Sequence, residues 1–213
     1  GLPYDLGEAA TLFKELGLEV FNSHVGMPEG DGKDAMLKLT EAFELSRVAI
    51  AYLPDTEFDT IDKIKATCER LNQANAFAKE NGVERGYHNH WWECRALDGE
   101  QTLDVMLAEL DKDIFFEVDT YWVKVGGLDP VAFVESLGNR APLLHLKDGP
   151  LVQQAGMTAV GSGKMPIPEL VKVSVATAEW YIVELDRCDT DMLTAVQDSY
   201  NYLTSNQFAK GKK

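Results

Sequence analysis

Short apolar runs alternate with segments of helical spacing along most of this chain. Apolar runs of this length indicate strands, whereas apolar residues three or four positions apart indicate one buried face of a helix. The runs at residues 18–25, 48–53, 85–90, 114–121, 142–147 and 181–185 predict six strands. The apolar stripes predict helices within residues 61–78, 103–110 and 193–203. Strands that alternate with helices are typical of βαβ units and a parallel sheet.

Residues typical of helix ends and helix starts flank the predicted helices. Gly17, Gly82 and Gly138 follow predicted helices, as glycine often does at a helix C-terminus. Asp129 is placed to cap a helix that begins at Pro130. The longest irregular stretch, residues 148–165, follows a predicted strand and is expected to be a mobile loop over a site. Its "GSGK" segment fails the phosphate-loop spacing.

The number of strands decides the expected fold. We predict an α/β fold of the (β/α) TIM-barrel type over a single domain at residues 1–208, with a disordered tail at 209–213. A closed barrel normally has about eight strands and 250 residues, so the first two β/α units are expected to be lacking. A doubly wound open sheet is the alternative fold, but the chain has no G-x-G-x-x-G turn. The exposed sheet edge left by missing strands predicts a homo-oligomer.

Composition narrows the classes of partner. The formal net charge is −15, from 20 Lys and Arg against 35 Asp and Glu. Proteins that bind nucleic acid gain affinity from Lys and Arg, so a nucleic-acid partner is not expected. No apolar run approaches the roughly 20 residues that span a bilayer, so no membrane partner is expected either. The three cysteines lack C-x-x-C spacing, which favours a reducing, cytoplasmic location, although a leader could precede Gly1.

Polar side chains gather where the predicted strands end. All four histidines, His24, His88, His90 and His145, lie at such ends, and so do Glu117, Asp119, Glu184 and Asp186. In a parallel β/α barrel the C-terminal ends of the strands build the site. Burying such groups is costly unless they are paired or bound to a cation. Asp119, His145 and Glu184, from three consecutive strands, are therefore the strongest candidates for ligands of a divalent metal.

Each candidate also has a structural interpretation. A single histidine in a strand is often only hydrogen-bonded, and His24 is left open between the two roles. Glu117 fits equally well as a partner that orients a ligand. Trp122 and the other tryptophans after strand ends fit either a packed core or a platform for a sugar ring. Lys147 and Arg187 fit either hydroxyl or phosphate binding or structural ion pairs.

Five motifs in this order resemble the sugar phosphate isomerase/epimerase family, the xylose isomerase-like TIM-barrel group: "YHNHWWE", "FFEVDTYWVKVGGLDPV", "LLHLKDG", "VGSGKMPIPEL" and "WYIVELDR". The resemblance covers nearly the whole chain. It implies one divalent metal, Mn²⁺ before Co²⁺, Mg²⁺ or Zn²⁺, held by Asp119, His145, Glu184 and one further acid. Glu93 is the expected fourth ligand and His88 its rival. DNA-repair members would need a histidine where Trp122 stands.

The resemblance also implies an activity. We expect an isomerase or epimerase that removes a proton next to the carbonyl of a keto-sugar or polyol, through a metal-stabilised enediolate. Glu184 is the expected base, and Glu93 or His88 the opposing acid. The candidate substrate-binding residues are His24, His90, Lys147, Arg187 and Trp122. An inosose dehydratase-like or 3-keto-glycoside lyase reaction begins from the same enediolate and stays an alternative, as does a non-catalytic sugar-binding or interaction domain.

Overall fold

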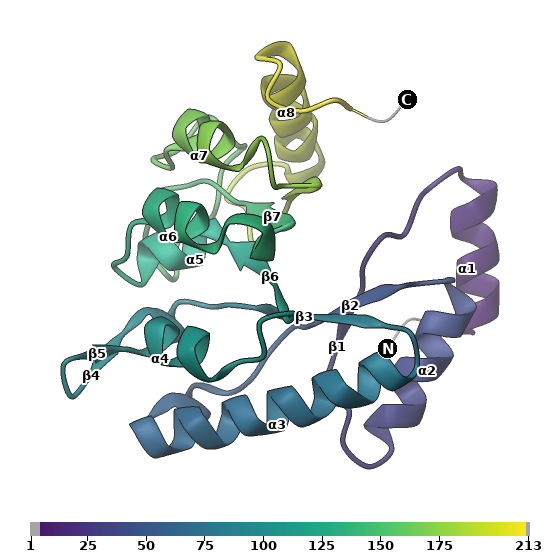
Figure 1. Cartoon of the computed structure of the whole chain (residues 1–213). Helices are drawn as coiled ribbons and strands as arrows, with labels where there is room; N and C mark the ends of the chain where they lie inside the picture. Colours follow the sequence, from purple (N-terminus) through teal and green to yellow (C-terminus); the bar gives the residue numbers. More distant parts are fainter. Residues whose placement is uncertain (1–4, 212–213) are drawn as a thin grey trace. The chain divides into compact units, whose positions relative to one another are not determined.

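The computed structural model describes residues 5–211 (Figure 1). These residues form two compact units, which are described separately. The first comprises residues 5–88 and Asp104–Phe115, and the second comprises Asn89–Leu103 and residues 116–211. The single domain predicted over residues 1–208 stays a prediction. Among residues 5–211, no helix has both the length and the apolar character needed to cross a bilayer.

The first unit contains three parallel strands with helices between them. In chain order its elements are α1 (Leu6–Glu15), β1 (His24–Val25), α2 (Gly32–Ala42), β2 (Arg47–Ile50), η1 (Asp55–Phe58), α3 (Ile61–Glu80) and β3 (Glu84–His88). Ala49 of β2 pairs with His24 on one side and with Gly86 on the other. The long α3 runs alongside β3 (Figure 1). Met36, Val48, Ala78 and Val83 form a buried apolar cluster.

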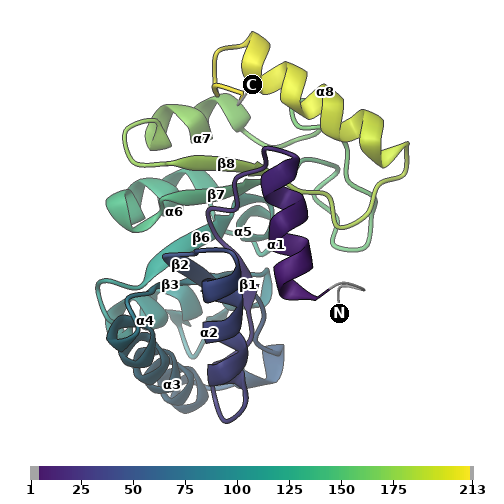
Figure 2. The same cartoon turned by 90° about the vertical axis from the view of Figure 1, so that its right-hand side faces the viewer.

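The second unit also contains three parallel strands with helices between them, and acidic residues lie at the ends of more of its strands. Its elements are η2 (Trp92–Cys94), β4 (Ala96–Leu97), β5 (Glu100–Gln101), β6 (Phe115–Asp119), α5 (Thr120–Val125), α6 (Pro130–Leu137), η3 (Gly138–Arg140), β7 (Leu143–Leu146), α7 (Ile167–Ser174), β8 (Trp180–Val183) and α8 (Met192–Ser205). Helix α4 (Thr102–Glu109) connects the two units along the chain. Strands β6, β7 and β8 lie side by side and parallel (Figure 2).

The six predicted strands are present, and the α/β fold of the TIM-barrel type is confirmed. Helix ends are as the sequence indicates. Asp129 accepts a hydrogen bond from the Val131 N–H at the start of α6, and Gly82 follows α3 with a positive φ. The strand predicted at residues 18–25 is confirmed only at its end, since β1 is His24–Val25. The antiparallel β4–β5 hairpin is an element that the apolar pattern does not predict.

Candidate functional site

Acidic or basic side chains lie at or next to the ends of three consecutive strands of the second unit. Asp119 ends β6 and pairs in register with His145 of β7. Glu184 follows β8 directly. Because parallel strands end at the same edge of a sheet, these side chains meet. One ligand atom from each of Asp119, His145 and Glu184 lies within 4.8 Å of the others.

His145 is held between two carboxylates. Its Nε2 lies 3.1 Å from Glu117 Oε1, and its Nδ1 lies 2.5 Å from Glu184 Oε2. Burial on its own lowers the pKa of His145, but the hydrogen bonds to Glu117 and Glu184 outweigh burial and raise the pKa to about 9. The two contacts fix the orientation of the ring. Metal-bound histidines are commonly oriented by a carboxylate on the nitrogen that does not bind the metal.

Lys147 brings a second cation into the same group. Its side chain is only 2% exposed, and its Nζ lies 2.9 Å from Asp119 Oδ2, 3.0 Å from Glu184 Oε2 and 2.9 Å from Asp186 Oδ1. Burial lowers the pKa of Lys147, but the three carboxylates more than reverse this and hold it above its ordinary value. Burial likewise tends to raise the pKa of Glu184, but His145 and Lys147 hold it well below its usual range.

The backbone around Asp119 explains its fixed position. Its Oδ1 accepts a hydrogen bond of 2.9 Å from the Trp122 N–H, so the side chain caps α5. The Asn89 side chain pairs with the Asp119 backbone, accepting from its N–H at 3.0 Å and donating to its carbonyl at 3.3 Å. Asp119 is fully buried, and this burial raises its pKa although Lys147 opposes the effect. The Trp122 ring is also buried, and its centroid lies 5.5 Å from Lys147 Nζ.

The predicted fourth ligand, Glu93, lies outside this group of three among the described residues. It is fully buried in η2, and its Oε2 accepts a hydrogen bond of 3.0 Å from the His90 N–H. The His90 ring stacks on Trp92 at 4.4 Å between centroids. The exposed Arg187 donates to the Gln154 carbonyl at 3.0 Å. The roles assigned to Glu93, His90 and Arg187 stay predictions.

The other two predicted histidines belong to the first unit. The His24 and His88 rings lie 5.0 Å apart between centroids, with His24 exposed and His88 buried. The structure thus places these two side by side, and the assignment of His88 as the rival fourth ligand stays a prediction.

Two residues of the site were given no role from the sequence. Asp186 was placed at a strand end together with Glu184, but its contact with Lys147 was not predicted. Asn89 lies between His88 and His90. Its importance comes from pairing with the backbone of Asp119, a contact that no local pattern predicts.

The glycine-rich loop after β7 is fastened by one buried carboxylate, that of Asp148. Its Oδ1 accepts hydrogen bonds from the backbone N–H groups of Gly149 and Met165, at 2.8 and 3.0 Å. Its Oδ2 accepts from Gly161 and Gly163, at 2.9 and 3.0 Å. A Cβ at Gly163 would lie 2.1 Å from Asp148 Oδ1, so glycine is required there. The segment predicted to be a mobile loop is thus tied to its own first residue.

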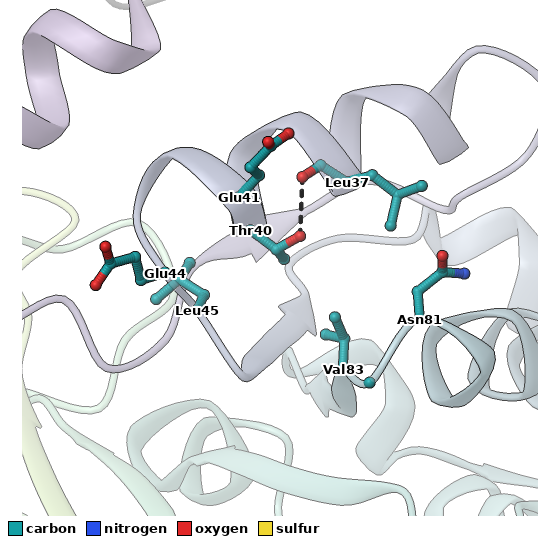
Figure 3. A pocket seen from close by; sticks show the side chains of 8 residues that line it. Leu37, Thr40, Glu41, Glu44, Leu45, Asn81 and Val83 are labelled. Carbon is teal, nitrogen blue, oxygen red and sulfur yellow. Dashed lines mark hydrogen bonds between the residues drawn. The ribbon is translucent and has the colours of Figure 1, made fainter.

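A pocket of about 370 Å³ in the first unit lies between the end of α2 and the start of β3 (Figure 3). Leu37, Leu45 and Val83 line it together with Glu41 and Glu44. The one hydrogen bond drawn there joins Thr40 Oγ1 to the Leu37 carbonyl within α2. The residues that line this pocket include no histidine, lysine or arginine beside the two carboxylates. The pocket is therefore a weaker candidate for a functional site than the group around His145.

The donors around His145 fit a divalent metal. One imidazole and two carboxylates are the ligand types of catalytic metal sites, which commonly use three protein ligands and leave a position for substrate. The ligand atoms of Asp119, His145 and Glu184 already lie close enough to surround one ion. Glu117 holds the far nitrogen of His145, as an orienting partner would.

Several solved structures are similar in fold to this chain. No protein-family model and no curated protein matches the chain. Among solved structures, a sugar phosphate isomerase/epimerase from Parabacteroides distasonis is 25% identical, with a TM-score of 0.82 over 97% of this chain and 78% of that one. This likeness shows that the chain has a fold of the TIM-barrel type.

Other solved structures agree with this fold. A second sugar phosphate isomerase/epimerase from Parabacteroides distasonis is 24% identical, with a TM-score of 0.73 over 95% of this chain and 82% of that one. A xylose isomerase domain protein from Alicyclobacillus acidocaldarius is 15% identical, with a TM-score of 0.69 over 97% of this chain and 84% of that one. Several structural neighbours of this chain are isomerase/epimerase-like proteins by name, in line with the resemblance of the sequence motifs.

Proposed function

We propose that this chain is a divalent-metal-dependent sugar isomerase/epimerase-like enzyme. The observation that carries the proposal is the meeting of Asp119, His145 and Glu184 at three consecutive strand ends, with their ligand atoms within 4.8 Å of one another. The likeness to a solved sugar phosphate isomerase/epimerase supports it. Mn²⁺ is the proposed ion, because a mixed carboxylate and imidazole set suits a hard or borderline cation.

The metal, when bound, would act as a Lewis acid that polarises a carbonyl or hydroxyl oxygen of the substrate. The chain's own residues would then hold and move the proton. Glu184 Oε2 faces His145 and Lys147 and would be the oxygen that holds the metal, which leaves Oε1 to take a proton from the carbon next to the carbonyl. Glu184 is about one-third exposed, so a substrate can reach it, while Asp119 is fully buried and serves only as a ligand.

The return of the proton is assigned to Glu93 or His88, as the sequence motifs imply. A proton returned to the same carbon on the other face gives an epimer, and one returned to the neighbouring carbon gives an isomer. Loss of a hydroxyl or glycosidic group from the same intermediate would give a dehydratase or lyase. These outcomes share the first proton transfer, so the first experiment targets that transfer.

The test has two measurements on the purified full chain. Elemental analysis should find about one equivalent of Mn²⁺, Co²⁺ or Zn²⁺ per chain. Incubation in D₂O with a panel of ketoses and inososes should place deuterium on the carbon next to the carbonyl. Glu184→Gln should abolish this exchange, whereas Glu169→Gln, which changes an exposed glutamate on α7, should leave it unchanged.

A chain that binds no metal and exchanges no deuterium would instead be a non-catalytic sugar-binding or interaction domain. Stoichiometric metal with a dehydrated or cleaved product would keep the site but change the reaction class. Self-association remains part of the proposal, and light scattering that finds only a monomer would remove it.

A further inference from the structure

Lys147 lies in the same space as the proposed metal. Its Nζ contacts Asp119 Oδ2 at 2.9 Å and Glu184 Oε2 at 3.0 Å, and these two carboxylates are two of the three candidate ligands. The lysine is almost completely buried, so its charge is not screened by water. This ammonium therefore balances part of the negative charge of the two carboxylates.

A divalent ion and this ammonium compete for the same oxygens. An ion bound by Glu184 Oε2 would lie at most about 5 Å from Nζ, the sum of a metal–oxygen bond and the present ion pair. Two positive charges at that distance repel strongly in a buried setting. The ammonium must therefore move away from Asp119 and Glu184 when the ion binds.

Asp186 provides the position to which the ammonium can move. Its two carboxylate oxygens already lie 2.9 and 3.0 Å from Lys147 Nζ, so the pair is bidentate. Asp186 is not a member of the metal-binding group, and its side chain is 31% exposed, closer to solvent than Asp119. A lysine held by Asp186 alone would keep a partner while it releases the two ligands.

We propose that Lys147 is a counter-cation that competes with a divalent metal for Asp119 and Glu184, and that Asp186 accepts its ammonium when the metal binds. This inference rests on the proposed function, because it concerns the same metal. Lys147 and Asp186 are then positioning residues that set the affinity for the ion. They do so in opposite directions, since Lys147 competes with the metal and Asp186 draws the competitor away.

The experiment is a titration of the metal-free full chain with Mn²⁺ by isothermal calorimetry. Lys147→Met should bind Mn²⁺ at least about tenfold more tightly than the natural chain, because the competing charge is gone. Asp186→Asn should bind about tenfold more weakly, because the ammonium keeps to Asp119 and Glu184. Lys124→Met, which removes an exposed lysine at the end of α5, should change the affinity less than about twofold.

The double variant separates transfer of the ammonium from a simple loss of negative charge. In the Lys147→Met background, Asp186→Asn should have less than about a twofold effect on Mn²⁺ affinity, because no ammonium remains to be accepted. An equal loss in both backgrounds would overturn the role of Asp186. Tighter binding by Asp186→Asn would overturn it as well.

Weaker binding by Lys147→Met than by the natural chain would mean that Lys147 organises the ligands instead of competing, and would overturn the inference. If Lys147→Met is too unstable without metal, the Mn²⁺-induced rise in its melting temperature, compared with that of the natural chain, gives the same comparison. Absence of Mn²⁺ binding in every variant would refute the proposed function itself. Binding by Lys147→Met alone would support the inference and count against a metal in the natural chain.

Discussion

Replacing Asp148 by asparagine should loosen the whole glycine-rich loop between β7 and α7. The carboxylate is 1% exposed and accepts four backbone hydrogen bonds, from Gly149, Gly161, Gly163 and Met165. An asparagine side chain keeps one oxygen and replaces the other with an amino group. Two backbone N–H groups would then face a donor instead of an acceptor.

The magnitude follows from the two lost bonds. A hydrogen bond to a charged group contributes about 1.5 to 3 kcal/mol, so two of them contribute about 3 to 6 kcal/mol. Because the lost bonds lie within one loop, part of the loss should appear as local opening instead of global unfolding. The total stability of a domain is about 5 to 15 kcal/mol, so a variant that loses only the remaining part globally should still fold.

Urea unfolding at pH 7 measures the global part, and amide hydrogen exchange measures the local part. For Asp148→Asn, the amides of Gly161, Gly163 and Met165 should exchange faster by a factor of about a hundred or more, the factor that corresponds to about 3 kcal/mol. The matched control is Asp129→Asn, which changes a carboxylate that accepts one N–H at the start of α6. Asparagine caps helices as well as aspartate does, so this control should change stability by less than about 0.5 kcal/mol.

Two outcomes would refute the reasoning about Asp148. One is a change in unfolding free energy below about 1 kcal/mol together with unchanged exchange at the three amides. The other is an equal effect of the control variant, which would mean that the number of accepted hydrogen bonds does not set the loss.

Two further predictions concern the rest of the chain. Gly86→Ala should destabilise the protein by about 1 to 3 kcal/mol in urea unfolding, because the added Cβ would lie 2.2 Å from the Phe115 ring. A smaller side chain at Phe115 should restore part of this loss. An unchanged free energy of unfolding would contradict the close packing. Among the thiols, half-exposed Cys188 should react with a disulfide reagent at pH 8, whereas Cys68 and Cys94 should react only in denaturant. Burial raises the pKa of Cys68 to about 12 and also raises the pKa of Cys94, so their thiolates are rare at pH 8. Rapid reaction of a second thiol in the folded protein would contradict this prediction.

The strands and their polar ends could be predicted from the sequence, because both depend on local order. Alternation placed Glu117 with Asp119, and strand ends placed His145 and Glu184. Those side chains lie where expected because parallel strands end at a common edge. The β4–β5 hairpin was not predicted, although its turn is an Asp-Gly pair, Asp98 and Gly99, with positive φ at both residues.

Contacts between side chains of different strands could not be read in the same way. The position of Lys147 between three carboxylates depends on the register of β6, β7 and β8 and on the direction of a long flexible side chain. Glu93 also follows a strand end, but the short helix η2 that holds it, and its hydrogen bond from the His90 N–H, are not predicted by the apolar pattern. The position of a residue after a strand therefore does not give the direction of its side chain.

The fastening of the loop by Asp148 has a consequence for phosphorylated substrates. Consecutive backbone amides in a glycine-rich turn are a common means of gripping a phosphate group. Here the amides of Gly161, Gly163 and Met165 already surround an anion that belongs to the protein, and those of Ser162 and Lys164 donate to the carbonyls of Ala159 and Gly149. An incoming phosphate would meet the negative charge of Asp148 at this turn. The phosphate group of a sugar phosphate would therefore bind at another part of the protein or make no contact with it.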